Sequence, residues 1–237
     1  FFFFLITSYL QAVTKKERIV LFILASLNFT HILDFIIMMP LSNYLIPFFK
    51  ITAFQFSLLV ASYSISAFIS GLVISLVIDR FDRKRSLLFA YVGFLIGTIC
   101  CGFAYSFELL LAARTLAGLF GGIIGAQVVA IVGDLVSYQR RGGAMAAVMS
   151  AFAVASIIGV PISLYLTNLF NYDWHVPFIL VGTLGVFFVP LIIKFVPSIK
   201  GHIVTRDKSE SPFKALITVC IVPAQRTALI FACLLMM

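Results

Sequence analysis

The stretch Asp79-Arg80-Phe81-Asp82-Arg83-Lys84-Arg85 separates two long apolar runs of the chain. The flanking runs, residues 55–78 and 86–104, are each about long enough to cross a hydrocarbon core as a helix, which takes roughly 20 residues. Lys and Arg side chains are retained in cytoplasmic loops when a membrane protein inserts. The stretch therefore predicts a tight cytoplasmic turn between two membrane-spanning helices.

The composition of the whole chain agrees with this interpretation. Hydrophobic residues make up 62% and charged residues 11%, with a mean hydropathy of +1.14, whereas soluble domains average about 45–50% apolar and about 25% charged residues. Six apolar segments have the length of a spanning helix: residues 19–41, 55–78, 86–104, 109–132, 144–166 and 176–196. The sequence thus predicts an all-α integral membrane protein with a six-helix bundle.

The order of apolar and polar segments divides the chain into four parts. We expect a cytoplasmic N-terminal segment (1–18), a six-helix transmembrane bundle (19–196), a cytoplasmic interdomain linker (197–223) and the start of a seventh transmembrane helix (224–237). The chain begins at Phe1 without a methionine, and its last apolar run stops at Met237. We therefore interpret the sequence as a fragment of a longer reading frame, with the seventh helix truncated.

The basic residues are distributed unevenly between the two sides of the predicted bundle. Fifteen of the 17 fall on one side: Lys15, Lys16, Arg18, Arg80, Arg83, Lys84, Arg85, Arg140, Arg141, Lys194, Lys200, Arg206, Lys208, Lys214 and Arg226. The opposite loops hold only Lys50, and Arg114 lies inside a span. By the positive-inside rule the N-terminus is cytoplasmic, and we expect a multi-pass protein of the cell (inner or plasma) membrane.

The net charge of +8 is therefore mainly a topology signal, with the lipid bilayer and its anionic headgroups as expected partners. The scattered basic residues form no nucleic-acid reading module, so we expect no nucleic-acid partner. Cys100 and Cys101 are neighbours in one span, and Cys220 and Cys233 stand alone. This spacing predicts neither a disulfide framework nor a metal site.

Small residues recur at every fourth position in the second and fifth predicted spans. The second has Ala67, Gly71 and Ser75, and the fifth has Ala147, Ala151, Ala155, Gly159 and Ser163. Such stripes allow helix backbones to approach closely in lipid. Each stripe alone is explained by ordinary tight packing, but their matching positions favour two inverted three-helix repeats, which are common in secondary transporters.

Two charged residues, Asp34 and Arg114, lie inside predicted spans, where each costs roughly 2.5–3.5 kcal/mol on insertion scales. They lie about seven and five residues from the outer ends of the first and fourth spans, or roughly 8–10 Å below the outer surface. These spans are corresponding members of the two predicted repeats. We therefore expect both side chains at similar depth, and this arrangement allows both to line one central cavity.

Further polar and small residues share helix faces with these two charges. Thr30, His31 and Met38 lie on the face of Asp34, with Asn28 at its edge, while Gly118, Gly121 and Gly125 align with Arg114 and Gln127 lies roughly opposite. Two interpretations remain open. Asp34 either forms a static ion pair or hydrogen bond that fixes helix packing, or it loads and releases a proton, which His31 could share.

The cytoplasmic turn resembles the hairpin signature of the major facilitator superfamily, within which the chain is most similar to drug:proton antiporters and sugar-efflux transporters. The matching residues are Ser75, Asp79, Arg80, Arg83, Lys84 and Arg85. Ser75 stands where Gly is usual, and Asp82 stands at the second Gly. The resemblance implies a conformational latch in which Asp79 pairs with Arg140 or Arg141, and Asp134 joins the network.

Two further motifs carry the resemblance. Arg114, Gly118, Gly121 and Gly122 resemble a fourth-helix motif of proton-coupled members, whose Arg assists proton transfer. The segment Gly159-Val160-Pro161 is similar to the antiporter motif of the fifth helix, with Val inserted. Because proline removes a backbone hydrogen bond and bends a helix, Ala155, Gly159 and Pro161 are the predicted hinge, and Gly71 belongs to the predicted packing set.

The resemblance implies the N-terminal half of a twelve-helix transporter that exports a small organic solute or drug in exchange for protons by alternating access. The proton gradient would be its energy source, with no cofactor and a monomeric full-length protein. The alternative is a proton symporter or facilitator that imports a sugar, nucleoside or organic acid. A membrane-embedded enzyme or a non-transport assembly protein is a third reading, but we expect no enzyme because no catalytic constellation is present in the sequence.

Overall fold

A computed structural model describes residues 14–77, 81–171 and 173–198. Every secondary-structure element within these residues is a helix, and six helices among them are long and apolar enough to cross a membrane. The prediction of an all-α six-helix membrane bundle is thus confirmed. Asp79, Arg80, nearly all of the predicted linker (197–223) and the start of the seventh helix (224–237) lie outside the described residues.

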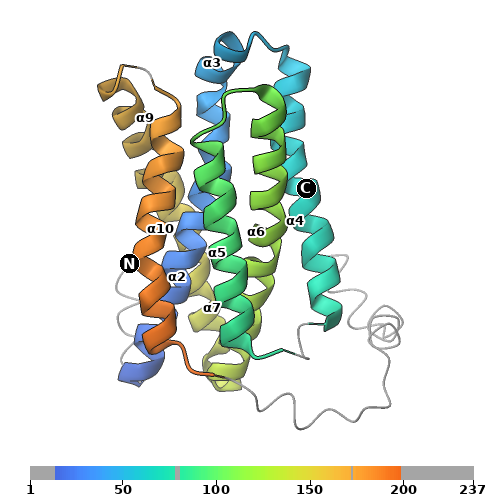
Figure 1. The fold of residues 1–237 in the computed structure, drawn as a ribbon. Helices are drawn as coiled ribbons and strands as arrows, with labels where there is room; N and C mark the ends of the chain where they lie inside the picture. Colours follow the sequence, from blue (N-terminus) through green and yellow to red (C-terminus); the bar gives the residue numbers. More distant parts are fainter. Residues whose placement is uncertain (1–13, 78–80, 172, 199–237) are drawn as a thin grey trace.

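The six spans follow one another in the chain, and the first and fifth are divided into shorter helices (Figure 1). The first span consists of α2 (Lys15–Ile36) and α3 (Met38–Phe49). The next three are α4 (Ala53–Val77), α5 (Arg83–Cys101) and α6 (Phe107–Leu135). The fifth consists of η2 (Tyr138–Arg140), α7 (Arg141–Met149), α8 (Ala151–Val154), the π-helical η3 (Ala155–Gly159) and α9 (Val160–Leu169), and the sixth is α10 (His175–Phe195).

Short polar side chains begin three of these helices. Thr14 and Glu17 form a capping box at the start of α2, Asp82 accepts a hydrogen bond from the backbone N–H of Lys84, and Ser106 accepts one from that of Leu109. These caps satisfy N–H groups that have no partner within the first turn of a helix. Asp82 in the cytoplasmic turn therefore starts α5 at the residue that follows it.

The first span is longer than predicted. The sequence predicted an end at residue 41, but the helix continues past a turn at Ile37 to Phe49. Pro40 does not end it, because proline is tolerated in the first turn of α3, where N–H groups lack partners anyway. Asp34 is thus about 22 Å along the helix from the end of α3, and its depth below the outer surface stays a prediction.

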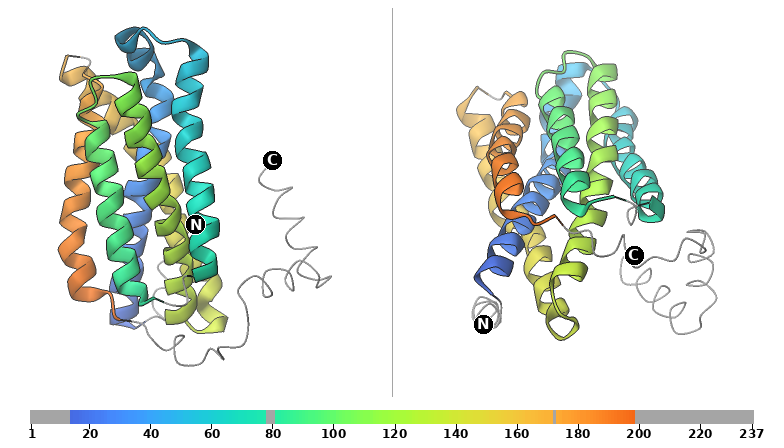
Figure 2. Two further views of the ribbon diagram at one scale, coloured as in Figure 1. Left: turned by 45° about the vertical axis from the view of Figure 1, so that its right-hand side comes forward. Right: turned by 60° about the horizontal axis from the view of Figure 1, so that its bottom comes forward.

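Helices of the first three spans pack against helices of the last three spans. α4 packs along α6, while the fifth span packs along α2; likewise α5 packs on α6, α10 packs on α2, and α5 and α10 contact each other. Figures 1 and 2 show these helices running side by side, with α4 parallel to α6 and α5 antiparallel to α6. Each contact of the first three spans thus has a counterpart among the last three, as the predicted 3+3 inverted repeat requires.

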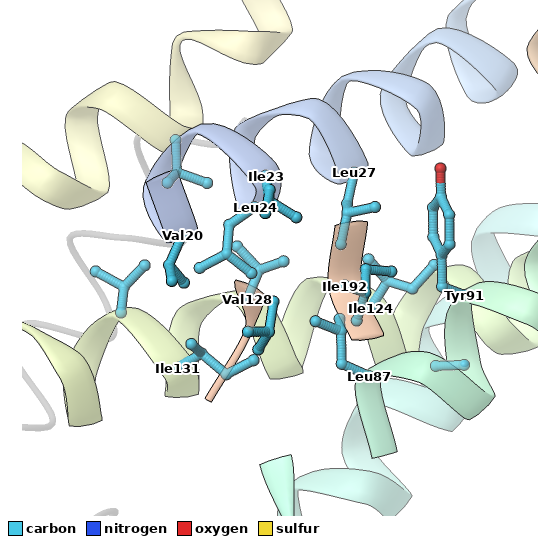
Figure 3. Packing of buried hydrophobic residues seen from close by; sticks show 14 of the residues in the cluster. Val20, Ile23, Leu24, Leu27, Leu87, Tyr91, Ile124, Val128, Ile131 and Ile192 are labelled. Atoms are coloured by element: carbon cyan, nitrogen blue, oxygen red, sulfur yellow. The ribbon is translucent and has the colours of Figure 1, made fainter. Parts of the chain in front are cut away.

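One apolar core lies where α2, α5, α6 and α10 meet, toward the end of the bundle at which α2 and α5 begin. Figure 3 shows Leu24 and Leu27 of α2 packed among Leu87, Ile124 and Val128, all buried. By contrast, large apolar side chains of α4 and of the fifth span are exposed, including Phe68, Ile157 and Tyr165. Exposed apolar surface of this extent on helices is expected where lipid or another membrane helix is the neighbour.

Glycines set the closest helix contacts. A Cβ on Gly122 would overlap the Ala67 carbonyl oxygen, and one on Gly71 would lie 3.7 Å from the Gly122 carbonyl oxygen. Gly71 and Gly122 therefore occupy the close contact between α4 and α6 that the small-residue stripe predicted. Ser75, the last member of that stripe, is instead exposed, and its hydroxyl donates to the Leu72 carbonyl oxygen.

Candidate functional site

The two intramembrane charges form an ion pair inside the bundle. Arg114 Nη1 on α6 donates to Asp34 Oδ2 on α2 at 2.7 Å, and both side chains are 0% exposed. The same nitrogen lies 3.4 Å from the Asp34 carbonyl oxygen. The pair therefore joins the first helices of the two repeats at one depth in the membrane.

Aromatic rings from two further helices surround the guanidinium group. Its Cζ lies 4.4 Å from the ring centroid of Tyr63 on α4 and 6.0 Å from that of Phe178 on α10. A cation within about 6 Å of an aromatic face is attracted by the ring quadrupole, and more strongly when it is desolvated. Arg114 thus contacts an anion and ring faces in a setting without exposed surface.

Several polar atoms around the pair have no hydrogen-bond partner among the described residues. They are Asp34 Oδ1, Arg114 Nε and Nη2, Tyr63 Oη, Thr98 Oγ1, and both ring nitrogens of His31. Buried polar groups in proteins are almost always paired, because an unpaired one costs about 1–3 kcal/mol. Donors and acceptors are thus concentrated around the ion pair.

The polar residues predicted to share one face of α2 contact several different helices. Thr30 bonds the Tyr91 hydroxyl on α5 at 3.1 Å, Asn28 donates to the Val148 carbonyl oxygen on α7 at 3.2 Å, and the His31 ring lies between those of Tyr63 and Phe94. α2 is surrounded by other helices, so neighbouring positions on its face meet different partners.

Within the described bundle Asp34 and Arg114 are fully buried, and Thr30 and Asn28 are 2% and 5% exposed. Only His31 of this set is partly exposed. The predicted proton-coupling residues therefore lie within the bundle, beneath its surface. That Asp34 and Arg114 line a central cavity of the complete protein stays a prediction.

The sequence reasoning missed Tyr63 and Thr98. Tyr63 lies four residues before Ala67, so it continues the small-residue stripe of α4 toward the outer side. That position was the available signal, because an i, i+4 neighbour of a contact stripe faces the same helix. Thr98 gave no signal, since single threonines are common in membrane helices and usually bond their own backbone.

The cytoplasmic turn connects three helices. Arg83 Nε donates to Asp134 Oδ2 at 2.9 Å, which joins α5 to α6, and Lys84 Nζ donates to the Ile193 carbonyl oxygen of α10 at 2.6 Å. The Ser198 hydroxyl donates to the carboxylate of Asp82, also at 2.6 Å. The structure thus pairs Arg83 with Asp134 and Lys84 with the end of α10, around the start of α5.

The other predicted gating residues that the structure describes lie elsewhere at the same end of the bundle. Arg140 Nη1 lies 3.5 Å from Glu17 Oε2 at the start of α2, and Arg141 Nε donates to the Val136 carbonyl oxygen at 3.1 Å. Arg85 is exposed. The predicted partnership of Asp79 with Arg140 or Arg141 falls outside the described residues and stays a prediction.

The predicted hinge of the fifth span coincides with a change of helix type. Residues Ala155–Gly159 form a π-helical turn directly before Val160 and Pro161. A Cβ on Gly159 would lie 2.7 Å from Leu33 Cδ1, so this turn packs closely against the residue that precedes Asp34. π-bulges in helices are frequent at functional sites.

An aromatic cluster that the sequence reasoning did not anticipate joins the end of α3 to the start of α10. The Trp174 and His175 rings stack at 3.7 Å, and Phe48 packs edge-on against both. His175 Nδ1 also lies 2.5 Å from Asp173 Oδ1. Partial burial acts to raise the pKa of Asp173, but hydrogen bonds from the His175 backbone and ring outweigh it and lower that pKa.

Comparison with known proteins gives matches over most of the chain. The model of the Major Facilitator Superfamily matches residues 23–237. The MFS-type transporter YwfA of Bacillus subtilis is 30% identical over 50% of this chain and 29% of its own length. Multidrug resistance protein 3 of Bacillus subtilis is 27% identical over 57% and 27%, and the vacuolar membrane amino acid uptake transporter fnx2 of Schizosaccharomyces pombe is 34% identical over 43% and 17%.

Solved structures share the fold. A bacterial homologue of the human lysosomal transporter Spinster, in an inward-facing and unoccupied conformation, superposes with a TM-score of 0.69 at 18% identity. The match covers 86% of this chain and 47% of that one. The described bundle therefore corresponds to about half of that structure.

Proposed function

Because the chain belongs to the major facilitator superfamily, we propose that it forms the N-terminal half of a transporter that exports a small organic solute or drug in exchange for protons. Transport proceeds by alternating access, in which two bundles rock around a shared site near the middle of the membrane. The proton gradient supplies the energy, and no cofactor takes part.

The buried ion pair between Asp34 and Arg114 carries this proposal. It joins α2 to α6 with both side chains fully buried, and an intramembrane acid paired with a base is typical of proton relays in transporters. The atoms without a partner around it supply further sites for a proton, among them the two buried ring nitrogens of His31.

The coupling step is a single protonation. A proton that binds the Asp34 carboxylate converts it to the neutral acid, so the charge attraction to Arg114 is lost while the acid can still donate or accept hydrogen bonds. The contact between α2 and α6 weakens as a result. Because Gly159 packs against Leu33, next to Asp34, a small shift of α2 reaches the π turn of the fifth span directly.

The cytoplasmic turn supplies the gate in this proposal. Arg83 with Asp134, and Lys84 with the end of α10, fix the ends of three helices relative to one another. Ser75, Asp79, Arg80 and Arg85 complete the motif by resemblance. The gate holds one conformation until protonation at Asp34 shifts the balance between conformations.

Replacement of Asp34 by Asn tests the coupling in the complete transporter. Everted membrane vesicles with an imposed pH gradient are loaded with a panel of cationic and neutral drugs, and gradient-driven accumulation is measured. We expect Asp34→Asn to abolish accumulation, while Asp134→Asn, which changes an acid at the cytoplasmic end of the same bundle, retains a dependence on the gradient. Accumulation by Asp34→Asn at the wild-type level would remove Asp34 from the proton path.

Import is the second candidate, and one observation favours it. Val160 separates Gly159 from Pro161, so the fifth-helix motif departs from the antiporter pattern. The same bundle would then serve a proton symporter or facilitator for a sugar, nucleoside or organic acid. Comparison of right-side-out with everted vesicles under the same gradient decides between the two directions.

The membrane setting follows from the charges at the helix ends. The chain is a multi-pass membrane protein by its six spanning helices and its family. We further propose a cytoplasmic N-terminus in the cell membrane, contacts with anionic lipid headgroups, and a monomeric complete transporter.

A further inference from the structure

Arg114 has three close neighbours, each on a different helix. Asp34 Oδ2 lies 2.7 Å from Nη1, the Tyr63 ring centroid lies 4.4 Å from Cζ, and that of Phe178 lies 6.0 Å away. Only the first of these carries a negative charge. Any step that neutralises Asp34 therefore removes the anion and leaves the guanidinium with neutral partners: the ring faces, the uncharged acid and the Asp34 carbonyl oxygen 3.4 Å from Nη1.

We propose that Tyr63 is a positioning residue that holds the charged Arg114 side chain in place while Asp34 is protonated. This inference rests on the proton coupling proposed above. It names the side chain that stabilises the Arg114 cation while Asp34 is protonated. The ring face acts on the cation, so the hydroxyl of Tyr63 is not required for the effect.

Two glycines of α6, Gly118 and Gly121, allow Tyr63 of α4 to lie close to Arg114. A Cβ on Gly118 would overlap the Tyr63 carbonyl oxygen, and one on Gly121 would lie 2.7 Å from Tyr63 Oη. With any larger residue at these positions, α4 would be pushed away from α6 and the ring away from the guanidinium. The spacing of Arg114, Gly118 and Gly121 thus has a physical explanation: it seats an aromatic ring of α4 beside the charge of α6.

The electrostatic argument concerns the state without the carboxylate charge. A buried cation whose partner is removed is strongly destabilising, because its desolvation is no longer compensated. An aromatic face compensates part of this loss, and it does so more strongly in a desolvated site than at an exposed one. Phe178 lies at the outer limit of the effective distance, so Tyr63 provides most of this compensation.

Among the described residues, no second Asp or Glu is ion-paired with Arg114. The titratable groups that face it are His31 on α2, Tyr63 on α4 and the thiol of Cys101 on α5. α10 faces it with Phe178. Within the described residues, Asp34 is the acid that is ion-paired with Arg114.

A double-mutant comparison of thermal stability tests the inference without a transport assay. The complete transporter is purified in detergent as wild type and as Asp34→Asn, and Tyr63→Leu and Tyr63→Phe are introduced into each. We expect Tyr63→Leu to lower the melting temperature by about 3–5 °C more in the Asp34→Asn background than in the wild type. Tyr63→Phe, which keeps the ring, should show no such difference.

Phe178→Leu is the matched control, because it removes a buried ring at the larger distance and should lower stability equally in both backgrounds. Equal losses for Tyr63→Leu in both backgrounds would overturn the inference. If Tyr63→Leu does not fold, Tyr63→Met, which fills more of the ring volume, gives the same comparison.

A pH profile of transport provides the second readout. Tyr63→Leu should move the acid limb of the rate profile to lower pH, because the state with neutral Asp34 loses a stabilising contact, and Tyr63→Phe should leave it in place. An equal shift with Tyr63→Phe would assign the effect to the hydroxyl and contradict the proposal. Gradient-driven transport by Asp34→Asn would instead refute the coupling itself, so the two failures are distinguishable.

Discussion

Arg83 Nε and Asp134 Oδ2 lie 2.9 Å apart and join the start of α5 to the end of α6. The Arg83 side chain is 5% exposed and that of Asp134 29%, so this ion pair is less screened than a surface pair. Arg85, two residues later, is exposed. Adjacent basic residues of one motif therefore have different structural roles.

The first prediction separates those roles. We expect Arg83→Ala to lower the free energy of unfolding by about 1.5–3 kcal/mol, because a charged hydrogen bond is lost and Asp134 is left without it. Arg85→Ala should change it by less than about 0.5 kcal/mol, as for other exposed substitutions. Thermal unfolding of the purified variants in one detergent gives the comparison, and equal effects of the two would contradict it.

The second prediction concerns the close contact between α4 and α6. Gly122→Ala should destabilise the protein by about 1–3 kcal/mol, because the added Cβ overlaps backbone atoms of Ala67, which are not free to rotate away. Gly125→Ala is the control on the same helix, since nothing lies within 4 Å of its added Cβ. There the change should be neutral or stabilising, because alanine has the higher helix propensity. The melting temperatures of the two variants should therefore differ in sign or clearly in size.

The third prediction concerns the carboxylate of Asp173, which lies just before the start of α10. Although burial opposes it, hydrogen bonding by His175 lowers the pKa of Asp173 below its ordinary value of 3.8. A lowered pKa means that the charged form stabilises the folded state above pH 3.8, and that this contribution disappears as the pH falls from 3.8 through the folded-state value. Asp173→Asn should remove this part of the acid sensitivity. The melting temperatures of both proteins are measured between about pH 2.5 and about pH 6, from about one unit below to about two units above the ordinary pKa of aspartate. They should differ above pH 3.8 and become equal as the pH falls below it.

The fourth prediction concerns orientation in the membrane. Single cysteines at Lys50 and Arg85, both exposed, in a background without the four native cysteines, should be labelled by an impermeant maleimide from opposite sides. Intact cells should label Lys50→Cys, and everted vesicles should label Arg85→Cys. Labelling of both from one side would contradict the assigned topology.

The sequence predicted those features that depend on length, hydrophobicity and charge. Six spans, the inverted repeat and the matched depth of Asp34 and Arg114 follow from the spacing of apolar and charged residues, because lipid imposes a strict length on each helix. The pairing of these two charges was one of two open interpretations. The spacing of the two residues could not distinguish these interpretations. The rotation of each helix relative to its neighbours determines whether a side chain faces a partner or a cavity.

Features that depend on contacts between helices were harder to predict. The extension of the first span to Phe49 was missed because Pro40 suggests an end, although proline in a first turn breaks no hydrogen bond. Tyr63 was missed because only its i, i+4 spacing to Ala67, and not its residue type, links it to the contact stripe of α4. The π turn at Ala155–Gly159 changes neither composition nor periodicity enough to be seen in one sequence.

The last prediction tests whether that π turn is a hinge. Pro161 has no N–H, so the carbonyl groups of the preceding turn cannot all be bonded in a regular α-helix, and the backbone there is easier to deform. In Pro161→Ala the restored N–H can bond the preceding turn and stiffen it, so we expect unchanged or higher thermal stability together with several-fold slower transport. Pro190→Ala in α10 is the control, since Pro190 is also exposed and inside a helix but is not next to a π turn. Equal transport rates for Pro161→Ala and the wild type would show that the fifth span moves without bending at this position.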